Sequence, residues 1–150
     1  MIRLMLIGLF VLAALSGCSR NEGTAPPIVH YGEDVCALCA MIVSDERFAA
    51  AIVAPGDGER FVALYDDIGD MLVHEEAMAK VGAVMWVHDF DTSEWIKAQE
   101  AFYCAQSDLV TPMASGIAAF ATRDAAQRVA TEYSGSVADY TALLQITVTP

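Results

Sequence analysis

FAAAIVAPGDGERFVALYDD, residues 48–67, contains the pattern that decides the fold. Two short apolar runs, Phe48–Ala54 and Arg60–Tyr65, flank the turn-forming run Pro55–Gly58. Apolar runs of this length separated by a Gly/Pro cluster are typical of two antiparallel strands joined as a hairpin. The centre of the chain therefore predicts a β-hairpin at the core of a small domain.

The order of an apolar strand, a capping residue and a helix occurs twice along the chain. Asp66 or Asp67 caps a predicted helix that runs to about Lys80, and Thr122 caps a second helix over 123–133. The other predicted elements are strands at Ile42–Val43, Ala83–His88, Ala101–Ala105 and Ile117–Ala121, a loop at 109–116, a last short helix at 137–144, and a tail or edge strand at 146–148. This order predicts an α+β fold of two small related halves, each with antiparallel strands plus a helix.

The first residues predict a lipoprotein signal peptide, residues 1–17. Arg3 precedes an apolar run, Leu4–Leu15, that is shorter than the roughly 17–25 residues of a membrane-spanning helix. Small residues then lead into Cys18, a pattern that resembles the bacterial lipobox, whose cysteine is acylated and becomes the mature N-terminus. A soluble exported protein with a cysteine near its cleavage site is the alternative. Ser19 after the cysteine favours the outer over the inner membrane.

The rest of the chain divides into a tether and one domain. Residues 18–28 are polar and contain Gly and a Pro pair, which predicts a lipidated flexible tether. The domain is expected over 29–150, with halves at about 29–90 and 91–150. Twenty acidic residues against eight Lys and Arg give a formal net charge of −12, which argues against nucleic acid as a partner because such partners require a basic face.

The cysteines carry the clearest chemical signal. With Cys18 assigned to lipid, Cys36, Cys39 and Cys104 remain, an odd number for an exported protein in an oxidising compartment. Thiolate and thioether ligands suit Cu(I) better than calcium, magnesium or manganese, so Cys36-x-x-Cys39-x-Met41 indicates a soft-metal site. If this segment is extended, Cys39 and Met41 point to the same face.

A third ligand is expected from elsewhere in the chain, and Met113 in the Thr-Pro-Met-Ala-Ser-Gly loop is the best candidate. Met71, His74 and His88 are weaker candidates. The alternatives remain open: a lone Met is usually core filler, Cys36 and Cys39 can form a disulfide, and Cys104 is expected to be a buried thiol. Structural zinc usually has four Cys or His ligands, and the chain contains one such pair.

An exported thiol–disulfide oxidoreductase that uses Cys36 and Cys39 is the second functional hypothesis. Thiols of that class open a helix after a strand, whereas this pair follows a loop-like run, Tyr31–Asp34. The sequence contains no Ser-His-Asp set, phosphate loop or dinucleotide fingerprint, so it gives no positive support for an enzyme.

Five stretches in a specific order resemble the NosL family of nitrous-oxide reductase accessory lipoproteins. They are CALCAMIVSD (36–45), YDDIGDM (65–71), VHDFDTSEW (87–95), AFY (101–103) and TPMASGIAAFAT (111–122). The resemblance implies a Cu(I) chaperone, facing the periplasm, that supplies the copper–sulfur centre of nitrous-oxide reductase. It also implies that the protein acts together with periplasmic nitrous-oxide reductase maturation proteins and an ABC-type membrane complex.

The resemblance implies that Cys39, Met41 and Met113 are the metal ligands, because the family's Cys-x-Met and Thr-Pro-Met motifs fall on them. The chain departs from the pattern at Ala40, where the family usually has glycine. Cys36 is not required by the motif; it is an extra ligand, a redox lock on Cys39, or neither.

Overall fold

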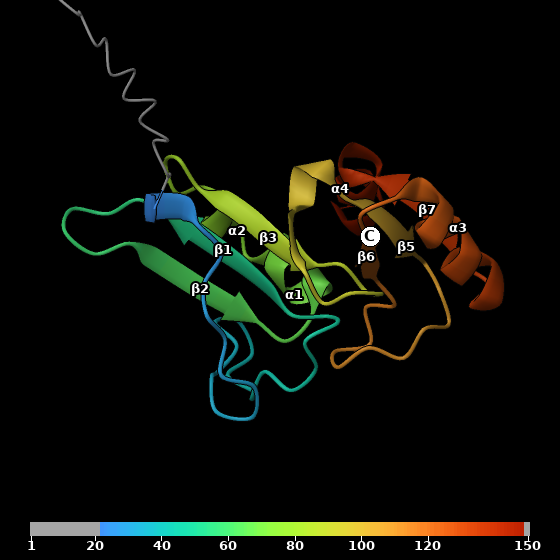
Figure 1. Cartoon of the computed structure of the whole chain (residues 1–150), viewed down its shortest axis with the longest axis horizontal. Helices are drawn as coiled ribbons and strands as arrows, with labels where there is room; N and C mark the ends of the chain where they lie inside the picture. The colour runs from blue at the N-terminus through green and yellow to red at the C-terminus, as the bar shows by residue number, and fades with distance from the viewer. Residues whose placement is uncertain (1–21, 149–150) are drawn as a thin grey trace, which may run out of the picture.

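Two antiparallel sheets lie side by side with helices packed against them in the computed structural model, which describes residues 22–148 (Figure 1). The strand orders are β2-β1-β3-β4 and β6-β5-β7. The strands are β1 (Ala50–Ala54), β2 (Phe61–Tyr65), β3 (Val84–His88), β4 (Trp95–Lys97), β5 (Phe102–Ala105), β6 (Ala118–Phe120) and β7 (Ser136–Asp139). The helices are α1 (Ile68–Val73), α2 (Glu75–Met78), α3 (Arg123–Glu132) and α4 (Tyr140–Val148), with short 3₁₀ turns η1 (Glu22–Thr24) and η2 (Ala98–Glu100). The predicted α+β fold of two halves is confirmed.

The central hairpin forms as predicted. β1 and β2 pair from Ala50 opposite Tyr65 to Ala54 opposite Phe61, across the predicted turn. Every residue of β1 is buried, because β2 and β3 pair with its two edges and α1 and η1 both contact it. A strand enclosed in this way needs apolar residues on both faces, which explains the uninterrupted AAIVA sequence. The larger core continues from this hairpin into the second half, where Tyr103 and Leu143 are fully buried.

The first sheet extends a few residues past the approximate border of 90/91 expected between the halves. Trp95–Lys97 forms β4 and pairs with β3, so it belongs to the first sheet. The turn between these strands closes where the Asp89 amide donates to the Glu94 carbonyl at 2.8 Å. A three-residue strand ending in lysine has too little apolar pattern to be detected from sequence.

The C-terminal prediction is also partly wrong. Residues 136–139 form β7 instead of the start of a helix, and Ala138 lies opposite Tyr103 of β5. Helix α4 begins only at Tyr140 and includes the predicted tail at 146–148. The apolar spacing of this segment fits either structure, and the pairing with β5 decides it.

Two smaller predictions require correction. The helix after β2 is interrupted at His74, whose Nδ1 is 2.8 Å from the Tyr65 hydroxyl, so that α1 and α2 replace one continuous helix. Ile42–Val43 does not form a strand; Ile42 makes a single antiparallel bridge with Val35.

Contacts with the sheet begin before the predicted domain border at residue 29. The Thr24 carbonyl accepts a hydrogen bond from Trp86 Nε1 at 2.9 Å, and the Ala25 carbonyl accepts one from Arg60 at 2.9 Å. The predicted signal peptide and Cys18 lie outside the described residues. Within residues 22–148, no helix has both the length and the apolar character needed to span a membrane.

Candidate functional site

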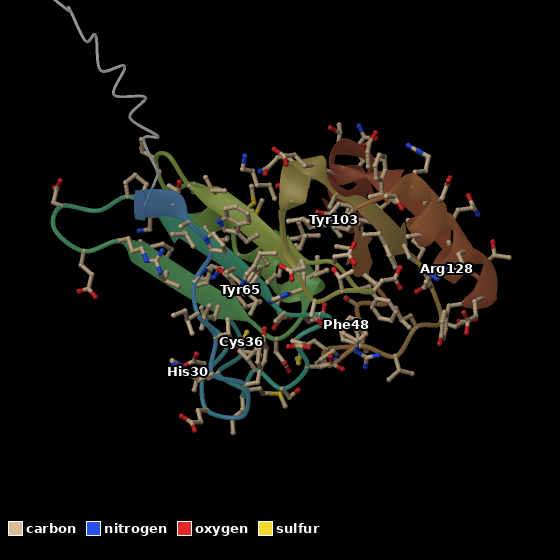
Figure 2. All side chains as sticks on the ribbon, in the orientation of Figure 1. His30, Cys36, Phe48, Tyr65, Tyr103 and Arg128 are labelled. Atoms are coloured by element: carbon tan, nitrogen blue, oxygen red, sulfur yellow. The ribbon has the colours of Figure 1, made fainter. Side chains whose placement is uncertain are left out.

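The two cysteines of the soft-metal motif lie in a tight loop beside the end of β2. The Cys36 amide donates to the Met41 carbonyl at 2.7 Å, and the Ala40 amide donates to the Cys36 carbonyl at 3.0 Å. The Ala37 amide donates to the Leu64 carbonyl at 2.7 Å, which fastens the loop to β2. Figure 2 shows Cys36 below Tyr65, the last residue of β2. These bonds fold the loop back on itself and bring its sulfur atoms to α1.

Cys36, Cys39 and Asp70 converge in space. Their ligand atoms all lie within 4.8 Å of one another, and the Cys36 thiol donates to Asp70 Oδ2 at 3.4 Å. Cys36 is buried, whereas Cys39 and Asp70 are half-buried. Both cysteines are free thiols, so the disulfide alternative is not realised in this structure. The pair therefore offers two neighbouring sulfurs, one of them open to solvent.

The pKa of the Cys39 thiol is raised to about 11, chiefly by burial; hydrogen bonding with Cys36 and Asp70 also raises it, whereas the hydrogen bond with the Met41 backbone lowers it. Cys39 is therefore a neutral thiol near pH 7. A metal that binds it must displace a proton, because the thiolate is the metal ligand.

The expectation that Cys39 and Met41 share a face through strand alternation is wrong. Ala40 between them has φ of 59°, in the left-handed region, and the backbone turns there. Glycine adopts this conformation without strain, whereas other L-residues pay about 1–2 kcal/mol. Met41 is more than half exposed, at 54%. Backbone strain of this kind clusters at functional sites, and here it lies next to the exposed thioether of Met41.

Replacing Ala40 by glycine should stabilise the protein by about 0.5–1 kcal/mol, because the strain relieved exceeds the added chain entropy of the unfolded state. Urea unfolding of the reduced protein measures this change. Ala37 is the matched control, since it lies in the same loop outside the left-handed region. Ala37→Gly should lower stability, and an equal loss in Ala40→Gly would show that the conformation carries no strain.

Met113 lies in a second loop that a buried carboxylate holds against α1. Asp67 Oδ2 accepts from the Thr111 hydroxyl at 2.6 Å and from the Met113 amide at 3.0 Å, and its Oδ1 accepts from the Gly69 amide at 2.7 Å. Asp67 is fully buried, so these bonds are shielded from water. Ala114, directly after Met113, also has a left-handed φ of 59°. One carboxylate thus caps α1 and fixes the methionine loop.

The close approach of this loop explains Gly69. A β-carbon at Gly69 would lie 2.6 Å from the Ser115 β-carbon, so only glycine lets the loop pack on this turn. Asp67 therefore fastens the Met113 loop, and Asp70, three residues later, contacts Cys36 of the other loop. The first turn of α1 is the element to which both sulfur-bearing loops are attached.

The weaker candidates are engaged elsewhere. Met71 is fully buried in the core, and His74 is bonded to Tyr65. His88 is buried, with Nδ1 2.7 Å from the Ser93 carbonyl and Nε2 2.9 Å from the Tyr31 hydroxyl. A carbonyl only accepts, so Nδ1 carries the proton and Nε2 accepts from Tyr31.

The environment of His88 keeps it neutral. Burial lowers the pKa of His88, and burial together with Glu46 and Asp45 raises the pKa of Tyr31 to about 12. Trp95 stacks on the imidazole with the ring centroids 3.7 Å apart. Both ring nitrogens are occupied, so His88 is a structural residue. Cys104 is a fully buried free thiol, as predicted.

Two functional candidates were not predicted as such. Asp67 was expected only as a possible helix cap, which it is, whereas its neighbour Asp66 accepts instead from the Ser44 amide at 2.7 Å. Asp70 gives no distinctive sequence signal, since an acidic residue in the first turn of a helix is explained by the helix dipole.

The fold and the loops define the class: a small two-sheet α+β protein that carries soft sulfur donors on two loops joined by one helical turn. The chain belongs to the NosL family, whose model matches residues 27–147. Its fold is similar to the crystal structure of the copper chaperone NosL from Shewanella denitrificans, with 18% identity over 77% of this chain and 96% of that chain and a TM-score of 0.58. No curated protein sequence matches the chain.

Proposed function

We propose that this protein is a Cu(I)-binding metallochaperone. The observation that carries the proposal is the attachment of the Cys36–Met41 loop and the Met113 loop to the same turn of α1, through Asp70 and Asp67. Thiolate and thioether are soft ligands that select Cu(I). Membership of the NosL family supports the same conclusion, as does the fold shared with a protein described as a copper chaperone.

In this proposal Cys39 supplies the one thiolate that copper requires, and Met41 and Met113 supply neutral thioethers. Cys36, whose sulfur lies within 4.8 Å of that of Cys39, is the candidate for a fourth ligand. Met41 and Met113 are 54% and 36% exposed. Neutral ligands at the surface can be replaced by those of a partner, so the site suits transfer of its cargo better than permanent storage.

The recipient we propose is the copper–sulfur centre of nitrous-oxide reductase, reached together with periplasmic maturation proteins and an ABC-type membrane complex. We further propose that a lipid on Cys18 anchors the domain on the periplasmic side, at the outer membrane in preference to the inner. The role is that of a carrier and not of an enzyme. The proposed recipient and partners rest on the family resemblance, and the proposed lipid anchor rests on the sequence of the N-terminus.

An anaerobic Cu(I) titration against a competing chelator, with reduced protein beginning at Ser19, tests the proposal. We expect each protein chain to take one Cu(I) ion from the chelator. The absence of any withdrawal would contradict the proposed function.

The oxidoreductase alternative is less compatible with the structure. The Cys36–Cys39 turn does not open a helix, because residues 40–47 that follow it contain none, whereas redox thiols of that class stand at the start of one. The pKa of Cys39 is raised to about 11, chiefly by burial, whereas catalytic redox thiols have lowered pKa values.

The raised pKa of Cys39 predicts a strong pH dependence of copper affinity. Because the thiol stays protonated up to about pH 11, Cu(I) must displace its proton throughout the range from pH 6 to 9. The apparent affinity should therefore rise about tenfold per pH unit, without levelling near pH 8.5 as for an ordinary thiol. Chelator competition at four pH values measures the slope. A rise of about a hundredfold in affinity per pH unit would show that Cys36 also binds as thiolate. An affinity that does not change with pH would exclude thiolate ligation.

A further inference from the structure

The folded domain begins very close to the cysteine proposed to carry the lipid. Glu22–Thr24 already forms the turn η1, and the Thr24 carbonyl accepts a hydrogen bond from Trp86 of β3 at 2.9 Å. An extended chain covers at most about 3.6 Å per residue, so the Cys18 α-carbon lies within about 14 Å of that of Glu22. We propose that this short tether holds one end of the first sheet against the bilayer surface and turns the copper-binding loops away from it. The orientation rests on the lipid anchor of the proposed function.

The membrane-facing end consists of η1 and the turns 55–60 and 80–82. A β-carbon at Gly82 would lie 3.2 Å from the side chain of Pro55, and one at Gly23 would lie 3.9 Å from it. The Arg60 guanidinium donates to the Ala25 carbonyl at 2.9 Å. These contacts bring the start of the domain and the two turns together, so a lipid attached just before η1 places all three segments near the headgroups.

The proposed copper ligands lie at the other end of the strands. The Cys36–Met41 loop is bonded to Leu64 of β2, and Asp67, just beyond β2, accepts from the Met113 amide at 3.0 Å. The five residues of β2 run from the membrane-facing end to these loops, which separates the two by about 13 Å of strand. The views agree, since η1 lies at the upper edge of the first sheet and Cys36 lies below it (Figure 1, Figure 2).

The tether is too short for the domain to turn over on the membrane. A folded domain of this length has a radius of gyration of about 14 Å and is therefore roughly 35 Å across. A tether of at most about 14 Å covers less than half of that width. The end that carries η1 therefore stays at the bilayer, and the copper-binding loops face the aqueous phase, where a protein partner can reach them.

The distribution of charge favours the same orientation. Residues 30–46, which include the copper-binding loop, contain four acidic side chains and no Lys or Arg. An anionic bilayer repels such a surface. The membrane-facing end is nearly balanced, with Glu22, Asp57 and Glu59 against Arg60 and Lys80. Val81 at its tip is 91% exposed, and an apolar side chain in this position gains by entering the headgroup region.

Quenching of tryptophan fluorescence by a lipid with a nitroxide on its headgroup tests the orientation. The full-length, lipid-modified protein is reconstituted into vesicles of phosphatidylethanolamine and phosphatidylglycerol that contain this lipid. Val81→Trp and Val110→Trp are the matched pair, because the two valines are 91% and 87% exposed and lie at the membrane-facing end and in the Met113 loop. Trp86 and Trp95 are present in both variants, so any difference belongs to the introduced indole. We expect quenching at least about twofold stronger in Val81→Trp.

A longer tether separates its effect from that of the surface. With about twelve Gly and Ser residues inserted after Asn21, the quenching of Val81→Trp should fall to the level of Val110→Trp. Equal quenching with the native tether, or a difference that survives the insertion, would overturn the proposed orientation by the tether. Failure of the wild-type protein to float with the vesicles would overturn the lipid anchor and the orientation together. The Cu(I) titration uses protein that begins at Ser19, so the copper proposal stands or fails separately.

Discussion

Replacing Cys39 by serine should remove tight Cu(I) binding, with a loss of affinity greater than about a hundredfold. Cys39 is the only thiolate among the three main copper ligands, and the two thioethers carry no charge with which to hold the ion. The substitution exchanges one half-buried atom, so the fold should remain intact. Chelator competition gives the affinity, and far-ultraviolet circular dichroism confirms the fold.

Cys104→Ala is the matched control for the loss of a thiol. Cys104 is fully buried in the second half, and burial raises its pKa. Its replacement should lower stability by about 1 kcal/mol, as the removal of a buried group does, without changing copper affinity. If Cys104→Ala weakens binding as much as Cys39→Ser does, the site lies elsewhere.

Asp67→Asn should weaken Cu(I) binding by about 10–100-fold although Asp67 is not a proposed ligand. The carboxylate accepts on one oxygen from Gly69 and on the other from Thr111 and Met113. An amide retains only one accepting atom, so it can cap the helix or hold the Met113 amide but not both. The Met113 loop should therefore separate from α1, and stability should fall by about 1–3 kcal/mol.

A double-mutant cycle separates this positioning role from general destabilisation. If Asp67 acts by placing Met113, then Asp67→Asn combined with Met113→Ala should be no weaker in copper binding than the weaker single variant. Additive losses would contradict the positioning role. Asp66→Asn is the matched control, because this neighbouring buried carboxylate accepts through Oδ1 from Ser44, an arrangement that the amide oxygen preserves. It should leave copper affinity within about threefold.

The hairpin and the helix caps could be predicted from sequence because their signals are local. Pro55–Gly58 marks the turn, and the side chains of Asp67 and Thr122 accept from backbone amides in the first turns of α1 and α3. β7 could not be predicted, since Val137 and Ala138 fit a helix or a strand equally well until β5 pairs with them. The final structure of that segment depends on a partner more than thirty residues away, as the pairing of Ala138 with Tyr103 shows.

The candidate site was predictable in its chemistry but not in its geometry. Cys36, Cys39, Met41 and Met113 could be selected because soft sulfur donors are recognisable by residue type. The left-handed backbone at Ala40 has no sequence signal, so the predicted alternation of Cys39 and Met41 was wrong. Asp67 joins Met113 across forty-six positions, a contact that no local pattern encodes.

Copper K-edge X-ray absorption of the Cu(I)-loaded protein tests the central claim most directly, since it distinguishes sulfur from nitrogen or oxygen neighbours. We predict a first shell of sulfur alone, with three neighbours in the wild-type chain and one fewer in Met113→Ala. A first shell that contains nitrogen or oxygen, or one that Met113→Ala leaves unchanged, would contradict a copper site assembled from the two loops on α1.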